Sequence, residues 1–535
     1  MHRNTSHVNR EIPGFSSDAH RPGAGAQREV GRRTPLMHGS GKSDNRVVPK
    51  KVSNNARRRA AEGLEGRRLA KWNLPQASTL RTQGRARVLE ALGRVRQAAE
   101  LKKGVRFTTL LHHIYAIDTL RAAFYELERD AAPGVDGETW QHYGEELEAN
   151  LVELSDRVRR GAYRPQPVRR VYIPKRGDAK QQRPIGVTAL EDKIVQRATV
   201  AVLNAVYEPE FAGFSYGARP GRSAHQALVA VDRAIEKRRV KWVLDADLRD
   251  FFGSLEHEQL IRFVEHRIGD KRVVRLIQRW LAVGVLEDGT WTQSETGAPQ
   301  GGSISPLAAN LYMHYVFDVW AQRWRRTEAH GDVVIVRYLD DFIVGFQYRQ
   351  DAERFLSTLR ERLGQFGLTL HPDKTRLLEF GRYAVQNRQE RGLGKPETFQ
   401  FLGFVHSCGR TGKGEFMVHR HTVADRLRAK LKEVKAELRL RRHDPVPEVG
   451  KWLGSVVRGH CRYYGMPGNR RAIAQFRDEV SRHWHHALSR RSQKGPVRWD
   501  RMHRLIQRFI PPARIVHPSS SVMFAVMTQG KSPIR

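Results

Sequence analysis

The chain has 535 residues, with 94 Lys and Arg against 57 Asp and Glu, so its formal charge is +37. This length predicts several domains, and the positive surplus favours nucleic acid as a partner over a passive basic surface or an anionic membrane. Its two cysteines, Cys408 and Cys461, lie too far apart for a Cys-x-x-Cys zinc site, and the lack of a long apolar segment predicts a soluble, cytoplasmic protein.

The first two predicted segments are residues 1–75 and 76–240. Residues 1–75 are rich in Gly, Ser, Asn and Arg without apolar periodicity, which predicts a basic, disordered extension that either orders on nucleic acid or remains a passive tail. In the second segment we expect an apolar helical stripe over residues 110–127, a strand over 168–174 and a helix through 194–206.

Residues 241–415 are predicted to form an α/β centre. Strand, helix, hairpin, helix and strand follow one another over residues 241–248, 305–320, 333–346, 355–366 and 368–370. Ser305 is expected to cap the first of these helices, with Pro306 at its first position. The order is that of a split βαβ unit, a small sheet covered by helices, in which the first strand can lie beside the hairpin.

The C-terminal part of the chain has a different pattern. Residues 416–500 carry apolar residues at helical spacing among many Arg and Lys, which predicts an all-helical domain. Residues 501–535 contain several prolines and little periodicity, so we expect an irregular tail there.

Three carboxylates mark a candidate metal site in the α/β centre. Asp247 follows an apolar strand, and the adjacent Asp340 and Asp341 lie at the tip of the predicted hairpin. Taken singly, each is also typical of a strand end or an Asp-rich turn. Adjacent buried carboxylates repel each other, however, and a divalent cation would relieve that repulsion. We expect two Mg²⁺ ions, held by Asp247, Leu248, Asp340 and Asp341, for in-line phosphoryl transfer.

The segment Tyr338-Leu339-Asp340-Asp341 between two apolar strands resembles the Tyr-x-Asp-Asp signature of the reverse transcriptases. The resemblance implies RNA-directed DNA synthesis from dNTPs, with Mg²⁺ as cofactor and Mn²⁺ as a possible substitute. It also implies four dNTP-binding residues: a bulky side chain that crowds a ribose 2′-hydroxyl, a Gln beneath the incoming nucleotide, and two cations that grip the triphosphate. In this chain these are Phe252, Gln300, Lys175 and Arg183.

Further segments are similar to the reverse transcriptase–maturases that bacterial group II introns encode. They lie at residues 216–225, 300–307, 370–375, 399–404 and 457–465. The resemblance implies an α/β right-hand polymerase, with fingers after an N-terminal block in 76–240, a ferredoxin-like palm in 241–415 and a helical thumb or maturase domain in 416–500. It also implies contacts with intron RNA, and the candidate residues are Arg219, Arg222, Arg458, Arg462, Tyr463 and Tyr464.

The chain departs from that family in two respects. Leu339 stands where Ala is more common, and the cysteine pairs of the H-N-H endonuclease found in many relatives are lacking. We therefore expect priming from a nascent or other single DNA strand at the target. Two alternatives stay open: a splicing-only RNA-binding scaffold with a vestigial polymerase fold, and a reverse transcriptase of retron or defence type. The sequence also allows a homodimer.

Overall fold

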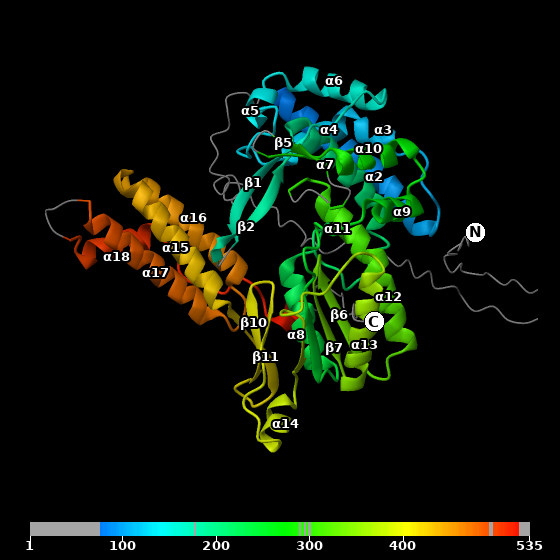
Figure 1. The fold of residues 1–535 in the computed structure, drawn as a ribbon. Helices are drawn as coiled ribbons and strands as arrows, with labels where there is room; N and C mark the ends of the chain where they lie inside the picture. The colour runs from blue at the N-terminus through cyan, green and yellow to red at the C-terminus, as the bar shows by residue number, and fades with distance from the viewer. Residues whose placement is uncertain are drawn as a thin grey trace, which may run out of the picture. The chain divides into compact units, whose positions relative to one another are not determined.

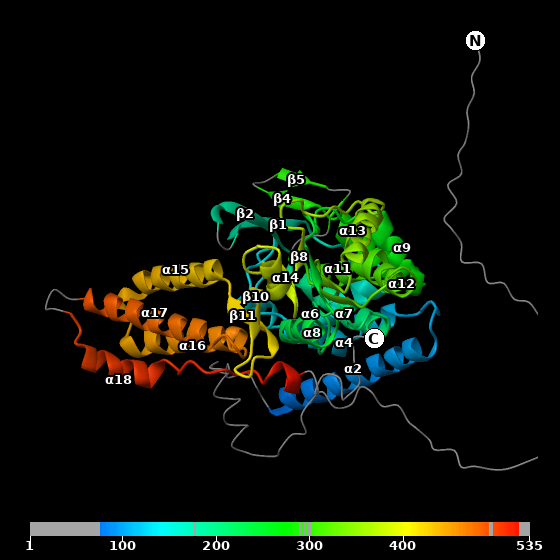
Figure 2. The same ribbon diagram turned by 90° about the horizontal axis from the view of Figure 1, so that it is seen from below.

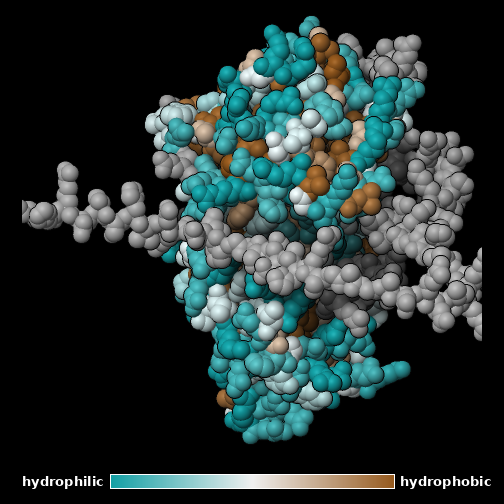
Figure 3. Space-filling view, turned by 90° about the vertical axis from the view of Figure 1, so that its right-hand side faces the viewer, coloured by the Kyte–Doolittle hydropathy of each residue, from teal (hydrophilic) through white to brown (hydrophobic). Residues whose placement is uncertain are grey.

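The computed structural model describes residues 75–175, 178–287, 290–293, 296–297, 301–491 and 496–523, all of which belong to one compact unit. The predicted extension over residues 1–75 therefore lies almost wholly outside the described residues. Within the described part, no helix combines the length and the apolar character that a bilayer crossing requires. The face drawn in Figure 3 is mainly hydrophilic, with hydrophobic residues in small groups, as the charged composition leads one to expect.

The N-terminal half contains helices and a four-stranded sheet (Figure 1). Its first elements are α2 (Pro75–Leu101), α3 (Leu111–Tyr115), α4 (Ile117–Glu126), α5 (Trp140–Tyr143), α6 (Leu147–Arg159), β1 (Val168–Lys175), β2 (Asp178–Val187) and α7 (Leu190–Tyr207). β1 pairs antiparallel with β2 and parallel with β4 (Val285–Glu287), and β5 (Thr290–Thr292) is the edge strand beside β4. The helical stripe predicted over residues 110–127 is divided at Ala116 into α3 and α4.

The centre of the chain is built on a second four-stranded sheet of order β6-β7-β3-β8. Its elements are α8 (Ala224–Lys237), β3 (Trp242–Ala246), α9 (His257–Arg267), α10 (Lys271–Ala282), α11 (Ser305–Met313), the π-helix η1 (His314–Asp318), α12 (Val319–Thr327), β6 (Val333–Tyr338), β7 (Asp341–Phe346), α13 (Arg349–Gly364) and β8 (Arg376–Glu379). The expectation that the first strand lies beside the hairpin is confirmed, because β3 pairs with β7.

Opposite faces of this sheet enter different hydrophobic cores. Leu244, Phe342 and Val344 pack with the α11–α13 side, whereas Val243 and Ile343 pack with α8. This alternation along β3 and β7 is what a strand with period two requires when both faces are covered. Figure 1 shows α8 on one side of β6 and β7, and α12 and α13 on the other.

Two details of the predicted centre are wrong. Ser305 is the first residue of α11 rather than its cap, because Ile304 before it already has helical backbone angles. The strand predicted over residues 368–370 is only an isolated bridge between Leu370 and Leu248, and the fourth strand of the sheet is β8. A turn over residues 371–374 separates that bridge from β8, so the regular pairing with β3 resumes only at Arg376.

The C-terminal part begins with a small sheet and continues as a helical bundle. Its elements are α14 (Ala384–Glu390), β9 (Phe399–Phe401), β10 (Phe404–Arg410), β11 (Phe416–Thr422), α15 (Ala424–Leu440), the short η2 (Arg441–His443), α16 (Val446–Tyr464), α17 (Arg470–Ser489) and α18 (Trp499–Phe509). Figure 2 shows α15 to α18 side by side, and they share one hydrophobic core. Helices α15 to α18 lie in the segment predicted to be helical, but its first residues, Phe416–Thr422, form the strand β11. The irregular tail predicted from residue 501 is wrong over residues 501–509, which belong to α18.

Candidate active site

Strand pairing brings the three predicted carboxylates together. In the antiparallel register of β3 and β7, Ala246 is opposite Phe342. Asp247, one residue further, therefore lies across from Asp341, although 94 positions separate them (341 − 247). Tyr338 pairs with Asp341, so the hairpin turn consists of Leu339 and Asp340 alone. The site is built by the end of one strand and the tip of a hairpin beside it.

The hairpin turn has an unusual backbone. Leu339 has a φ of +60°, in the left-handed region that side chains other than Gly rarely adopt. A tight two-residue hairpin demands a positive φ, and Gly or Asn is the usual residue there. Because Leu carries a branched side chain, this backbone must be held by its surroundings. The turn that presents Asp340 and Asp341 is therefore a rigid and strained element.

The carboxylates interact strongly with one another. Burial raises the pKa of Asp341 well above its usual range, and the neighbouring charges of Asp245, Asp340 and Asp247 raise it further. Burial and then Asp247 also raise the pKa of Asp340. A group of buried, mutually repelling carboxylates favours either protonation or a bound cation.

Asp245 is a member of this group that the sequence analysis missed. Burial raises its pKa to about 6, although Arg376 lies 3.5 Å from it and acts in the opposite direction. Its position could have been found, because residues two apart on a strand point to the same face. Asp245 and Asp247 therefore share a face of β3.

Lys374 is a second residue that sequence reasoning missed. Its Nζ lies 2.7 Å from Oδ2 of Asp247, and the backbone N–H of His371 donates to the carbonyl of Asp247 at 2.8 Å. The turn over residues 371–374 thus holds Asp247 by both its side chain and its main chain. The resemblance of residues 370–375 to the intron-encoded enzymes implies no role for Lys374.

The donor chemistry fits a hard divalent cation, since carboxylate oxygens are the ligands that Mg²⁺ takes in proteins. Among the residues that the structure describes, no group of three or more His, Cys, Asp or Glu side chains is arranged to hold a metal ion. The side chain of Leu248 is buried in the core, so only its main-chain carbonyl could serve as a ligand.

Comparisons with known proteins show which family the chain resembles. A family model described as "Reverse transcriptase (RNA-dependent DNA polymerase)" matches residues 173–406, which include all of these carboxylates. Protein YkfC of Escherichia coli (strain K12) is 34% identical over 275 residues, covering 46% of this chain and 72% of that protein. The group II intron-encoded protein LtrA of Lactococcus lactis subsp. cremoris is 34% identical over 211 residues, covering 39% of this chain and 34% of that protein.

The chain belongs to the reverse transcriptases of group II introns. The protein named "Nuclear intron maturase 3, mitochondrial" of Arabidopsis thaliana is also similar. It is 29% identical over 124 residues, which cover 23% of this chain and 17% of that protein. The chain thus spans 72% of the length of YkfC but only about a third of the length of LtrA.

Of the four dNTP-binding residues predicted for this reverse transcriptase, the structure describes the side chains of Arg183 and Phe252. Arg183 is exposed on β2, and its charge lowers the pKa of Asp340. Phe252 is half-buried, and its ring lies edge-on against Phe251 with centroids 5.4 Å apart. The side chain of Lys175 and the whole of Gln300 lie outside the described residues.

Gly301, the residue that follows Gln300 in the sequence, lies directly against the first sheet. Gly301 has a φ of +117°, and a Cβ at this position would lie 2.4 Å from the carbonyl oxygen of Gly186 on β2. Only glycine allows such an approach of two backbones. The backbone at Gly301 therefore packs directly against β2 of the first sheet.

The prediction that Arg219 binds RNA is wrong. Its side chain is buried and paired with Glu208 at 2.7 Å, and it also donates to the carbonyls of Ala212 and Ser215 at 2.7 Å each. A guanidinium with these partners has no donor left for a phosphate. Arg222 is half-buried over the ring of Tyr216, at 5.3 Å from its centroid.

The candidate contacts in the helical bundle divide into two kinds. Arg458 and Arg462 are exposed and stand one turn apart on α16. Tyr463 and Tyr464 are half-buried against the hydrophobic core that contains Phe404, and the hydroxyl of Tyr463 donates to the carbonyl of Leu402 at 2.9 Å. The two tyrosines thus join α16 to the small sheet. Of these four candidate residues, the two arginines are the ones exposed to solvent.

Proposed function

We propose that this reverse transcriptase copies RNA into DNA with Asp247, Asp340 and Asp341 as its catalytic carboxylates. The observation that supports this is the mutual electrostatic contact of these carboxylates at the end of β3 and the tip of the β6–β7 hairpin. A protein that only bound RNA would have no physical reason to bring these mutually repelling carboxylates together, because their repulsion costs stability unless a cation offsets it. The geometry thus favours an active polymerase over a splicing-only scaffold.

The oxygens of the three carboxylates, with the main-chain carbonyl of Leu248, are the proposed ligands of Mg²⁺. When bound, two such ions supply an activated primer 3′-hydroxyl and neutralise the charge that develops on the phosphates. Lys374 orients the Asp247 carboxylate through its 2.7 Å contact. Arg183, Lys175 and Gln300 are the proposed contacts of the incoming dNTP, with Arg183 donating to its phosphates.

Phe252 is proposed to select dNTPs by filling the space of a ribose 2′-hydroxyl. Phe252→Ala is expected to raise the efficiency of rNTP incorporation relative to dNTP incorporation by about 10²-fold, the size of discrimination that a steric contact provides. Single-nucleotide extension of a primer on an RNA template measures this ratio. Tyr383→Ala, a change at an exposed aromatic residue, serves as the control and should leave the ratio unchanged. An unchanged ratio in the Phe252 variant would remove Phe252 from the nucleotide site.

We further propose that the protein acts as a maturase, which binds the RNA of a group II intron and promotes its splicing and insertion into a DNA target. The partners would be intron RNA, a DNA primer strand and dNTPs. The charge of +37 supports a polyanionic partner, and α16 presents Arg458 and Arg462 to solvent. A reverse transcriptase of retron or defence type gains no support, because the similar proteins include intron-encoded ones.

Replacing Arg458 and Arg462 together by Ala should weaken RNA binding and reduce its dependence on salt. Each lost phosphate contact removes one released counterion, so the slope of log K against log salt is expected to fall by about 2. Binding of a labelled intron RNA at several salt concentrations measures the slope. Arg349→Ala, at an exposed arginine on α13, is the control. An unaltered slope would place these two arginines outside the RNA interface.

Two assays on the wild-type protein test the proposal. Primer extension on an RNA template with dNTPs and Mg²⁺ tests the polymerase, and splicing of a group II intron RNA at low Mg²⁺ tests the maturase. We expect extension that requires the divalent cation, with Mn²⁺ as a substitute. Clean protein that binds RNA but extends no primer would support the splicing-only scaffold instead.

A further inference from the structure

A fully buried ion pair lies beneath the catalytic turn. The side chains of Arg337 on β6 and Asp318 at the end of η1 have no exposed surface. Nη2 of Arg337 donates to Oδ2 of Asp318 at 2.5 Å and Nε donates to Oδ1 at 2.7 Å, which is the two-pronged geometry of a strong pair. Its remaining nitrogen, Nη1, donates to the carbonyl of Leu339 at 2.8 Å and to Oδ1 of Asn310 at 3.1 Å. One arginine thus ties the strained turn to two helical residues.

A backbone contact supports the same turn from the side. The segment 214–217 runs along β6, where Arg337 N–H donates to the carbonyl of Phe214 at 2.9 Å and Tyr216 N–H donates to that of Arg337 at 2.8 Å. A Cβ on Gly217 would lie 2.5 Å from the backbone nitrogen of Leu339. Asn310 Nδ2 donates to the carbonyl of Gly217 at 2.7 Å. No side chain larger than that of Gly fits between this segment and the turn.

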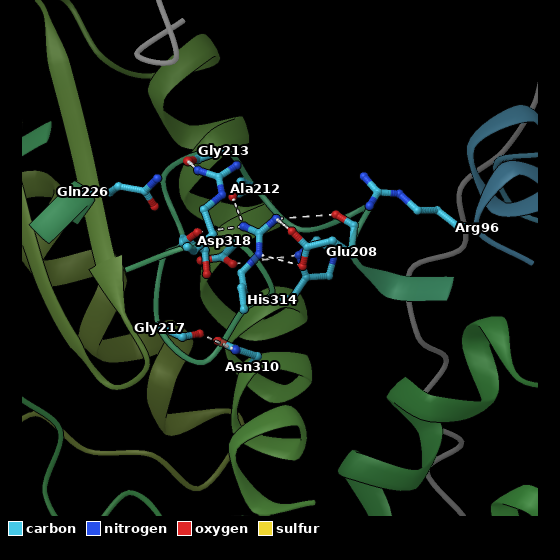
Figure 4. A network of polar contacts seen from close by, with 12 residues as sticks. Arg96, Glu208, Ala212, Gly213, Gly217, Gln226, Asn310, His314 and Asp318 are labelled. Atoms are coloured by element: carbon cyan, nitrogen blue, oxygen red, sulfur yellow. Dashed lines mark hydrogen bonds and ion pairs between the residues drawn. The ribbon is translucent and has the colours of Figure 1, made fainter. Parts of the chain in front are cut away.

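Figure 4 shows Asn310 beside Gly217, and Asp318, His314 and Glu208 close to one another. His314 Nδ1 lies 3.8 Å from Oδ2 of Asp318. The partner of Glu208 is Arg219, whose charge also interacts with that of Asp318. The segment expected to contact RNA through Arg219 is therefore part of the same buried network.

The π-helix η1 is the local irregularity that delivers Asp318. A π turn adds a residue to a helix and so rotates everything after it by about 100° relative to a continuous α-helix. Such turns are uncommon and are often found at functional sites. A buried charged pair is also a poor device for stability alone, because well-packed apolar residues stabilise a core as well or better. The pair is therefore better explained by its contact with the carbonyl of Leu339 than by a contribution to stability.

We infer that Arg337 and Asp318 are positioning residues for polymerisation. The pair holds the carbonyl of Leu339, and with Gly217 it keeps the left-handed turn in the conformation that presents Asp340 and Asp341 to the substrate. Residues 214–217 thus support the turn. The inference rests on the proposed polymerase activity.

Three variants separate positioning from simple stability. Asp318→Asn leaves the Arg337 charge unpaired and should lower both the melting temperature and kcat. The double variant Arg337→Met with Asp318→Leu removes both charges, so the melting temperature should recover while kcat stays about 10²-fold below wild type, the loss that a small misplacement of reacting groups causes. Gly217→Ala should show a similar loss of kcat, whereas Gly93→Ala, at a helical position with open space around it, should match wild type.

The measurements are kcat and KM for dNTP, the melting temperature, and the affinity for intron RNA. We expect unchanged RNA affinity in all folded variants, because Arg337 and Asp318 are buried. Recovery of kcat together with the melting temperature in the double variant would overturn the inference, as would a Gly217→Ala protein with wild-type kcat. Wild-type protein without any primer extension would instead refute the proposed function, and with it the inference.

Discussion

Asp340→Ala is expected to abolish cDNA synthesis on a primed RNA template while leaving RNA affinity and intron splicing intact. The change removes one of the carboxylates that surround the proposed cation site at the hairpin tip. Loss of such a ligand should lower the rate by about 10³-fold or more, equivalent to about 4 kcal/mol of transition-state stabilisation. Steady-state primer extension measures the first effect, and splicing of an intron RNA measures the second.

Because Asp340 is a turn residue, its removal should not unfold the protein. Asp247→Ala should give the same separation of activities, since Asp247 lies across from Asp341 in the same site. Asp478→Asn, at an exposed carboxylate on α17, is the matched control and should retain full extension activity. If splicing and extension were lost together in the Asp340 and Asp247 variants, the carboxylates would have a structural role rather than a catalytic one.

Gly301→Ala should cause the next largest loss, about 10²-fold in kcat/KM for dNTP. The added Cβ would lie 2.4 Å from the carbonyl oxygen of Gly186, and the φ of +117° is unfavourable for any side chain. A clash and a strained backbone of about 1–3 kcal/mol are enough for this effect. The loop next to Gln300 must then move away from β2, which disturbs the proposed dNTP site. Pre-steady-state incorporation of a single dNTP measures the change.

A second glycine with a positive φ separates the effect of the contact between Gly301 and Gly186 from the effect of backbone strain. Gly414 in the β10–β11 turn has a φ of +81° and nothing within 4 Å of an added Cβ. Gly414→Ala therefore carries comparable strain without the clash, and it should lower the melting temperature slightly with no change in kcat/KM. Equal losses in the two variants would mean that the approach of Gly301 to Gly186 has no part in nucleotide use.

The hairpin that carries Asp340 and Asp341 could be predicted because its signals are local. Two apolar strands flank Asp340 and Asp341, and burial on both faces of a sheet produces apolar strands of this kind. The order of the elements then limited the fold to a small set of arrangements, and one of them pairs β3 with β7. The boundaries were less certain, as Ser305 and residues 368–370 show, because the ends of elements depend on turns and tertiary contacts.

The charges beneath and around the site could not be assigned in this way. Arg219 lies in a basic segment typical of RNA contacts, yet its partner Glu208 and the carbonyls around it bury it completely. Whether an arginine meets solvent or a buried carboxylate depends on the residues that surround it after folding. Composition and spacing carry no information on that choice.

By itself, the sequence determined the α/β centre, the helical C-terminal part and the position of Asp247, Asp340 and Asp341 at strand ends, because periodicity and apolar runs are properties of neighbouring residues. Only the tertiary structure decided which distant groups act on them. Lys374 reaches Asp247 across 127 positions, and Arg337 reaches Asp318 through a π-helix that no periodicity predicts. Such pairings depend on how strands and helices pack, and packing depends on the whole chain.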